Sequence, residues 1–159
     1  MAAPPSSRAS PSAEVPFRPR AILETAVYAD DLDAAERFYG EVLGLECFAR
    51  APGRHAFFRC GLGVFLVFNP AETEHPGGMV PPHGGRGAGH MAFAVREREM
   101  GAWRDHLARR GVAVEAEVAW PRGGRSLYVR DPAGNSIELA TPAIWSIDER
   151  SALGTATEE

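Results

Sequence analysis

The chain repeats itself, and this repeat constrains its fold more than any other feature. Each half begins with a β-rich stretch, continues into an amphipathic helix and ends with three short strand candidates. Glu24 and His90 start the first strand of each half, 66 residues apart, and Gly44 and Gly111 end the two helices, 67 residues apart. A period this long indicates a duplicated module. The pattern predicts an α+β protein built from two βαβββ modules.

Shifts in composition mark the expected boundaries. Residues 1–20 are rich in Pro, Ser and Ala and are expected to form a disordered leader. The two modules are expected at 21–70 and 89–141, joined by a Gly- and Pro-rich linker at 71–88. Residues 142–159 are expected to form a C-terminal tail, of which the acidic end at 148–159 is expected to fray.

Charge and hydropathy argue against several classes of protein. The net charge is −4, which disfavours a nucleic-acid partner. Because no apolar run approaches the roughly 18 residues that span a bilayer, and the N-terminus lacks the apolar region of a signal peptide, we expect a cytoplasmic protein without membrane contact. Cys47 and Cys60 lack metal-type spacing and are interpreted as reduced, buried residues.

Three residues that can bind a metal stand at special points of the repeat. Glu24 and His90 occupy matching positions, and Glu138 lies between Ile137 and Leu139 in the last strand candidate, so its side chain points to the opposite face from theirs. A carboxylate on an enclosed face needs a cation, hydrogen-bond donors or water. Each residue alone is explained as an ordinary strand residue, but together two carboxylates and an imidazole suit Mn²⁺, Fe²⁺, Ni²⁺ or Zn²⁺. Three protein ligands also leave coordination positions open for substrate.

Four stretches, "ETAVYADDLDAAERFYGEVLGLE", "GVFLVFNP", "GHMAFAV" and "LYVRDPAGNSIELA", resemble the vicinal oxygen chelate superfamily of glyoxalases, bleomycin-resistance proteins and extradiol dioxygenases. The resemblance covers residues 21–141. It implies paired modules that form a U-shaped, partly open mixed sheet around a metal, with ligands on the first and last strands of the modules. Glu24 then matches the first-strand ligand, His90 the histidine of the "GH-x-A" motif and Glu138 the glutamate of "DPxGxxIEL".

The resemblance also implies departures from individual families. The fourth ligand position is expected at Phe65 or Val67, neither of which binds metal, so three ligands remain, as in the dioxygenases. Tyr128 matches the active-site tyrosine of the dioxygenases and is expected to act with Glu138 in catalysis, although simple packing is the alternative. The acid/base histidine of those enzymes is missing from "VAWPRGG", which contains Trp120. That departure, with a glutamate as first-strand ligand, argues against ring cleavage.

Other polar residues are candidates for substrate binding. His55 and Arg59 are four residues apart, so in a regular strand they share a face and are expected to contact an anionic substrate. Arg122 and Arg125 in "PRGGRS" are expected to clamp a carboxylate or phosphate, with a solvated surface arginine as the alternative for each. The linker, which contains His75 and His83, is interpreted as a lid.

These features favour a divalent-metal-dependent enzyme, glyoxalase-like or dioxygenase-like, that acts on a small oxygen-bearing substrate with one Fe, Mn, Ni or Zn ion. We expect a homodimer with no nucleic-acid or membrane partner. The alternative is a metal-free drug-binding protein of the bleomycin-resistance type. In either case the cavity would be lined by aromatic residues, for which packing in the core is the other interpretation (Phe57, Phe65, Phe68, Trp120 and Tyr128). The sequence leaves open whether Glu24 meets His90 and Glu138 within one chain or across two.

Overall fold

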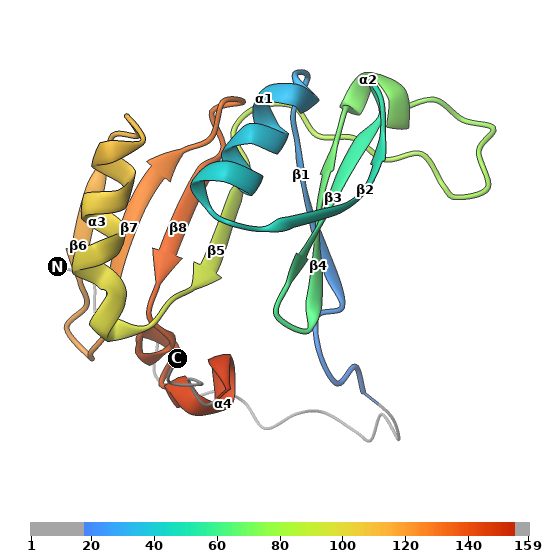
Figure 1. Cartoon of the computed structure of the whole chain (residues 1–159). Helices are drawn as coiled ribbons and strands as arrows, with labels where there is room; N and C mark the ends of the chain where they lie inside the picture. The colour runs from blue at the N-terminus through green and yellow to red at the C-terminus, as the bar shows by residue number, and fades with distance from the viewer. Residues whose placement is uncertain (1–17, 155–159) are drawn as a thin grey trace, which may run out of the picture.

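Each half of the repeat forms its own four-stranded sheet in the computed structural model, which describes residues 18–154 (Figure 1). The first sheet has the order β1-β4-β3-β2 and the second has the order β5-β8-β7-β6. In each sheet the first strand runs parallel to the last and the remaining pairs are antiparallel. The strands are β1 (Glu24–Tyr28), β2 (Glu46–Ala51), β3 (His55–Cys60), β4 (Gly63–Phe68), β5 (His90–Ala94), β6 (Ala116–Ala119), β7 (Arg125–Arg130) and β8 (Ser136–Ala140). This arrangement confirms the α+β prediction of two βαβββ modules with open, mixed sheets.

The helix of each module ends just before the glycine that the sequence predicts. Asp31 caps α1 (Leu32–Arg37) by accepting a hydrogen bond from the main-chain N–H of Ala34, and the helix continues as a π-helical turn, η1 (Phe38–Val42). In the second module a short 3₁₀ turn, η2 (Glu97–Glu99), leads into α3 (Met100–Arg109). Gly44 and Gly111 follow the two helices at φ of +73° and +70°, conformations that glycine adopts without strain.

One hydrophobic core joins the two modules. Phe65 of β4 packs against Phe93 of β5, with ring centroids 5.2 Å apart, and against the fully buried ring of Tyr39 at 4.7 Å. Thr25 of β1 and Met91 of β5 meet at the seam, where the threonine hydroxyl lies 3.6 Å from the sulfur. Because Val27, Phe65 and Phe93 belong to the same buried cluster, the modules fold as one unit.

The segment after β8 corresponds to the expected C-terminal tail. Residues 142–154 contain a 3₁₀ turn, η3 (Pro142–Trp145), and a short helix, α4 (Glu149–Leu153). The Glu149 carboxylate accepts a hydrogen bond from the main-chain N–H of Glu97, and Arg96 donates to the carbonyl of Leu153. These contacts dock residues 142–154 on the second module. Residues 155–159 and the first seventeen residues of the expected leader lie outside the described residues.

Two further expectations concern the linker and the cysteines. After α2 (Pro70–Thr73) the linker runs from the first module to the second, and the main-chain N–H of His83 bonds back to the carbonyl of Thr73. Cys47 and Cys60 are free but only half-buried, at the edge of the core. Within residues 18–154 no helix is both long enough and apolar enough to cross a bilayer.

Candidate functional site

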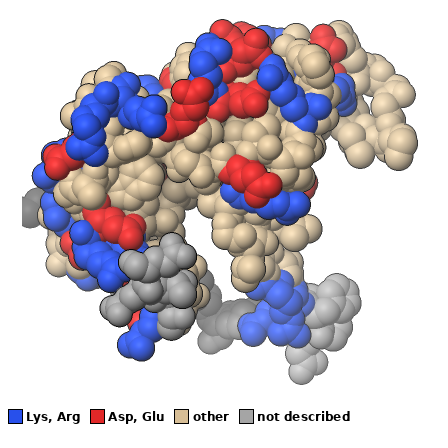
Figure 2. All heavy atoms as spheres, in the orientation of Figure 1, with Lys and Arg blue, Asp and Glu red and all other residues tan. Residues whose placement is uncertain are grey.

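Each sheet has one face that points away from the shared core, which we call the open face of that module. On β1 the buried side chain of Val27 faces the core, so Glu24, Ala26 and Tyr28 lie on the other side. On β5 the buried side chain of Phe93 likewise leaves His90 on the open face. Figure 2 shows the surface between the two modules as a hollow, on the side away from α1, bordered mainly by uncharged residues.

A chain of hydrogen bonds orients the carboxylate of Glu138 on the second open face. Glu138 of β8 is only 5% exposed. The Ser126 hydroxyl donates to Glu138 Oε1 at 2.5 Å, and the indole N–H of Trp120 donates to Ser126 Oγ at 2.9 Å. The other carboxylate oxygen, Oε2, lies 3.3 Å from Nε2 of His90. The structure therefore brings together two of the three predicted metal ligands, His90 and Glu138.

The hydrogen bonds of His90 fix which of its nitrogens is available. Its Nδ1 lies 3.1 Å from the carbonyl oxygen of Ser136, and because a carbonyl only accepts, Nδ1 must carry the proton. In the neutral ring Nε2 then has a bare lone pair, which faces the carboxylate oxygen of Glu138. Two facing acceptors are satisfied by a cation, a shared proton or a bridging water between them.

The separation of these two atoms fits a shared metal. Ligand nitrogen and oxygen atoms that each lie about 2.1 Å from one metal, at an angle between octahedral and tetrahedral, are about 3.0–3.4 Å apart. His90 Nε2 and Glu138 Oε2, at 3.3 Å, fall in this range. The backbone carbonyl on Nδ1 and the Ser126 hydroxyl on Oε1 are the kind of outer contacts that orient metal ligands.

Glu24 does not join this pair within the chain. Across residues 18–154 no three His, Cys, Asp or Glu side chains are grouped so that they could hold one ion. Glu24 instead lies exposed on the first open face, where it borders a cavity of about 730 Å³. The structure thus places the third predicted ligand on the other module.

Tyr128 lies directly opposite Glu138 in the pairing of β7 with β8. Its ring is nearly parallel to that of His90, with centroids 6.4 Å apart and an interplanar angle of 24°. Burial raises the pKa of the Tyr128 hydroxyl above its ordinary value, and the neighbouring Glu138 carboxylate raises it further. The hydroxyl is therefore protonated at neutral pH and can donate a hydrogen bond beside the carboxylate.

Aromatic rings line the cavity on the first open face. His55 stacks on Phe57, with centroids 4.0 Å apart and an interplanar angle of 12°, and Phe57 meets Phe68 edge-on at 5.3 Å. Burial lowers the pKa of His55, and the charge of Arg54 lowers it further, so the imidazole in this stack is neutral at neutral pH. The predicted substrate residue His55 therefore belongs to an aromatic wall.

Of the two other candidates, His83 borders the same cavity and Arg59 is not among the residues that line it. His83 of the linker also lines it, and its Nδ1 is 3.0 Å from the Tyr28 hydroxyl, so the linker is fastened at this edge of the cavity. The Arg59 guanidinium lies 4.3 Å above the ring of Phe48 and 3.9 Å from Glu46. Arg59 shares the face of His55, as predicted from the spacing.

The fourth ligand position of the resemblance falls on Leu66, and the expectation of Phe65 or Val67 is wrong. Glu24 pairs with Val64 and His90 pairs with Ser136, so the residue two places on, Leu66, corresponds to Glu138. Phe65 and Val67 are on the opposite side of β4, in the core, where they are 2% and 0% exposed. Leu66 is equally unable to bind a metal, so the expectation of three ligands is unchanged.

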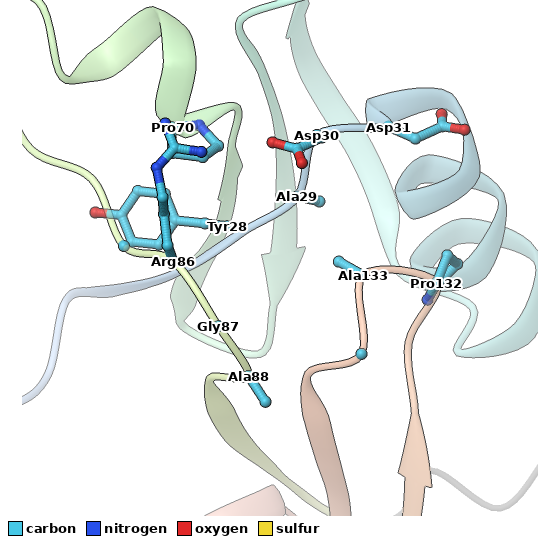
Figure 3. A pocket seen from close by; sticks show the side chains of 12 residues that line it. Tyr28, Ala29, Asp30, Asp31, Pro70, Arg86, Gly87, Ala88, Pro132 and Ala133 are labelled. Carbon is cyan, nitrogen blue, oxygen red and sulfur yellow. The ribbon is translucent and has the colours of Figure 1, made fainter.

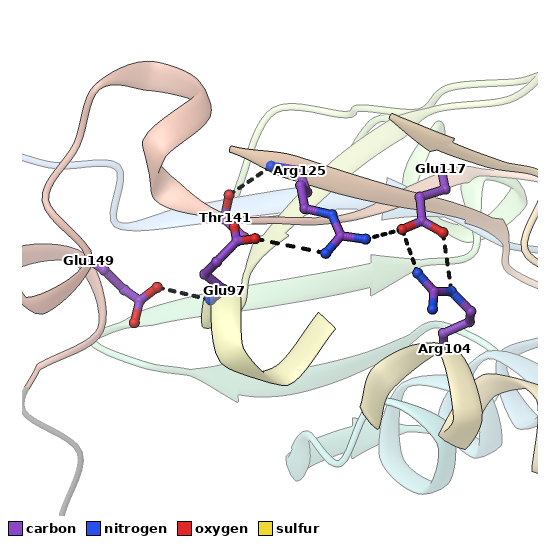
Figure 4. Close-up of polar contacts among 6 residues, drawn as sticks. All are labelled: Glu97, Arg104, Glu117, Arg125, Thr141 and Glu149. Atoms are coloured by element: carbon purple, nitrogen blue, oxygen red, sulfur yellow. Dashed lines mark hydrogen bonds and ion pairs between the residues drawn. The ribbon is translucent and has the colours of Figure 1, made fainter. Parts of the chain in front are cut away.

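Arg125 is engaged in an ion-pair network away from the open face. It neighbours Ser126 on β7 and so projects to the opposite side, where it pairs with Glu117, which also binds Arg104 of α3 (Figure 4). Hydrogen bonds from Arg104 and Arg125 hold the pKa of the Glu117 carboxyl below its ordinary value. Arg122 is exposed in the turn before β7. The structure does not bring either arginine to His90 and Glu138.

Ser126 and Trp120 are site residues that the sequence reasoning missed as a pair. The sequence gives Trp120 only the role of a cavity or core residue and gives Ser126 no role. Strand alternation could have found Ser126, because it lies two residues before Tyr128 and therefore on the same face. The indole contact depends on the turn between β6 and β7, which brings residue 120 back to residue 126.

Comparisons with known proteins agree with this architecture. The family model of the Glyoxalase/Bleomycin resistance protein/Dioxygenase superfamily matches residues 21–139. The crystal structure of a lactoylglutathione lyase from Agrobacterium tumefaciens is 42% identical, covers 81% of this chain and 98% of that chain, and superposes with a TM-score of 0.78.

More distant structures share the fold. A glyoxalase/dioxygenase from Nostoc punctiforme is 24% identical, covers 84% of this chain and 98% of that chain, and has a TM-score of 0.61. A glyoxalase/bleomycin resistance protein/dioxygenase from Nocardioides is 22% identical, covers 80% of this chain and 86% of that chain, and has a TM-score of 0.65. No protein with curated annotation matches the sequence. The chain belongs to the Glyoxalase/Bleomycin resistance protein/Dioxygenase superfamily.

Proposed function

We propose that the protein is a divalent-metal-dependent enzyme of the vicinal oxygen chelate type, acting on a small oxygen-bearing substrate. The observation that carries this proposal is the lone pair of His90 Nε2 facing a buried Glu138 carboxylate at 3.3 Å. An Fe, Mn, Ni or Zn ion suits this mixed nitrogen and oxygen donor set. Such a cation, when bound, supplies Lewis acidity toward adjacent substrate oxygens.

The protein's own groups would orient the substrate and handle its proton. Ser126 holds Glu138 Oε1, which leaves Oε2 as the free carboxylate oxygen on the open face. Tyr128, protonated at neutral pH and opposite Glu138 in the strand pairing, would donate to a substrate oxygen beside that carboxylate. The indole N–H of Trp120 donates to Ser126, and because an indole has no basic nitrogen it is not an acid/base group. The similarity to a protein named lactoylglutathione lyase supports lyase or isomerase chemistry over ring cleavage.

We propose that two chains complete each site. Glu24 is on the first open face, whereas His90 and Glu138 are on the second, and residues 18–154 of one chain do not bring all three together. A homodimer with twofold symmetry would face the first module of one chain with the second module of the other. Glu24 of the partner subunit would then supply the third ligand, and the aromatic wall around Phe57 would bind the body of the substrate.

A metal-free drug-binding protein is not favoured by these features. An aromatic cavity alone would suit such a protein, and the first open face has one. The second open face, however, keeps a buried carboxylate that is oriented by Ser126 and paired with a histidine. A site that only sequesters an apolar drug does not require that pair.

The test is metal content, measured by elemental analysis of protein purified without added metal or chelating resin. We expect about one equivalent per chain, lost in Glu138→Ala and in His90→Ala because each variant removes one coordinating group. Glu115→Ala and His75→Ala are matched controls, since both side chains are exposed and lie in other parts of the chain. Wild-type protein that takes up none of Mn²⁺, Fe²⁺, Ni²⁺ and Zn²⁺ would refute the proposal.

A further inference from the structure

A buried polar network crosses the junction of the modules and ends at His90. Its centre is Asn135, which is 1% exposed and lies just before β8. The residues beside this junction, among them Tyr28, Ala88 and Ala133, also line a pocket of about 490 Å³ (Figure 3). Asn135 itself is shielded from that pocket, so its hydrogen bonds do not compete with water.

The Asn135 amide makes three hydrogen bonds, and each partner group can act only as a donor or only as an acceptor. Its Oδ1 accepts from the main-chain N–H of Gly89 at 2.7 Å, and its Nδ2 donates to the carbonyl of Tyr28 at 3.1 Å. The same Nδ2 donates to Asp131 Oδ2 at 2.8 Å. Because an N–H only donates and a carbonyl only accepts, the orientation of the amide is unambiguous.

The carboxylate of Asp131 anchors this amide from the other side. Asp131 is 4% exposed and accepts from the main-chain N–H groups of Ala133 and Asn135. The hydroxyl of Tyr39, in the π-helical turn of the first module, donates to it at 2.7 Å. Such π-helical turns are frequent at functional positions. The anchor therefore includes residues of both modules.

The Asn135 amide is connected to His90 by main-chain groups that belong to, or directly precede, the paired strands β5 and β8. Asn135 holds the N–H of Gly89, the residue just before His90, and the Gly89 carbonyl accepts from the N–H of Ser136 at 2.9 Å. The Ser136 carbonyl is the group that fixes the proton on Nδ1 of His90. A Cβ at Gly89 would lie 3.0 Å from Asn135 Oδ1, so the contact requires glycine or a shift.

We propose that Asn135 is a positioning residue that sets the ring orientation and tautomer of His90 through Gly89 and Ser136. This inference rests on the proposed function in one respect: the correct position of Nε2 matters because that nitrogen would bind the metal. The tautomer itself is a property of the metal-free chain. The positioning role can therefore be tested whether or not metal binds.

The first measurement is the tautomer of His90 in metal-free protein, read from long-range ¹H–¹⁵N correlation spectra and assigned with His90→Gln. We expect the wild type to carry its proton on Nδ1, and Asn135→Ala to give a mixture of both tautomers. Tyr39→Phe is the matched control, because it removes one buried hydrogen bond to Asp131 but leaves the contact with Gly89. It should lower the melting temperature without changing the tautomer.

The second measurement is Zn²⁺ affinity, determined by titration with a competing chelator. Loss of an outer contact typically weakens metal binding about 10- to 100-fold, which we expect for Asn135→Ala and not for Tyr39→Phe. If Asn135→Ala does not fold, Gly89→Ala decides, because its Cβ presses on the same contact from the other side. It should shift the tautomer in the same direction.

The outcomes separate this inference from the proposed function. A shifted tautomer in a chain that binds no metal supports the positioning role and refutes the metal enzyme. An unchanged tautomer and unchanged Zn²⁺ affinity in the folded Asn135 or Gly89 variant overturns the positioning role, while metal binding by the wild type still stands. Equal tautomer changes in Asn135→Ala and Tyr39→Phe would show a general loss of packing and would also overturn it.

Discussion

The strand positions that hold Glu138, Tyr128 and Ser126 in the second sheet hold Leu66, Phe57 and His55 in the first. The second open face thus has an oriented carboxylate and a protonated hydroxyl, and the first has stacked rings around a cavity. The first-strand position is polar in both, with His90 matching Glu24, and the Ser126 hydroxyl corresponds to the stacked imidazole of His55. Duplication of one scaffold therefore allowed the chemical groups and the apolar surface to be placed on separate modules.

The largest expected effect is the recovery of metal binding when two inactive variants form mixed dimers. If the two faces meet across chains, Glu24→Ala and Glu138→Ala should each lose tight metal binding as separate proteins. Mixing them with subunit exchange should restore about one quarter of the wild-type metal, because half of the dimers then contain one intact site. Elemental analysis after gel filtration measures this. If the mixed protein contains no metal, either the site lies within one chain or the proposed metal site does not exist.

Leu66 offers a way to make the two faces more alike. We expect Leu66→Glu to lower the unfolding free energy by about 2–4 kcal/mol without metal, because Leu66 is only 7% exposed and a carboxylate there is desolvated. With Mn²⁺ or Ni²⁺ the variant should regain stability and bind more tightly, since a fourth ligand is added. Denaturant titrations with and without metal measure both effects. The control is Val64→Glu, one step along the same face, which should be destabilised without gaining affinity.

Tyr39, which is fully buried near the junction of the modules, should make the stability of the protein sensitive to alkali. Burial, and then the charge of Asp131, raises the pKa of the fully buried Tyr39 far above its ordinary value. A group whose pKa is raised by folding contributes stability that is present below its unfolded pKa of about 10 and is lost as the pH rises above it. We expect the unfolding free energy to fall above that pH by about 1.4 kcal/mol per pH unit for Tyr39. In Tyr39→Phe this slope should flatten, as measured by urea titrations from pH 8 to 11, and an unchanged slope would contradict the assignment.

The smallest effect is expected for Arg125, which lies on neither open face. Arg125→Gln should cost about 0.5 kcal/mol or less, because its ion pairs with Glu117 and Glu97 are solvent-exposed. If the aromatic wall binds substrate, His55→Gln should raise KM more than Arg125→Gln does. A larger rise for Arg125→Gln would restore that residue as a substrate clamp.

The fold could be predicted because the repeat, the helix-ending glycines and the strand alternation are all local signals. Leu66 shows where such signals fail. A shift of one residue moves a strand side chain to the opposite face, and only the pairing of β1 with β4 distinguishes Leu66 from Phe65 and Val67. Ser136 acts on His90 through its carbonyl oxygen, which no choice of side chain reveals. The position of Glu24 relative to His90 depends on how the modules pack, and the sequence left it open.

The hydrogen bond between Trp120 and Ser126 gives the protein an internal optical reporter. The indole N–H is bonded to the hydroxyl that holds Glu138, so a change in charge at that carboxylate alters the polarity around the ring. Trp120 is 40% exposed, which leaves its emission sensitive to whatever covers the open face. In a Trp103→Phe, Trp145→Phe background, fluorescence from this single ring would follow ligand arrival at Glu138 in real time, without a label.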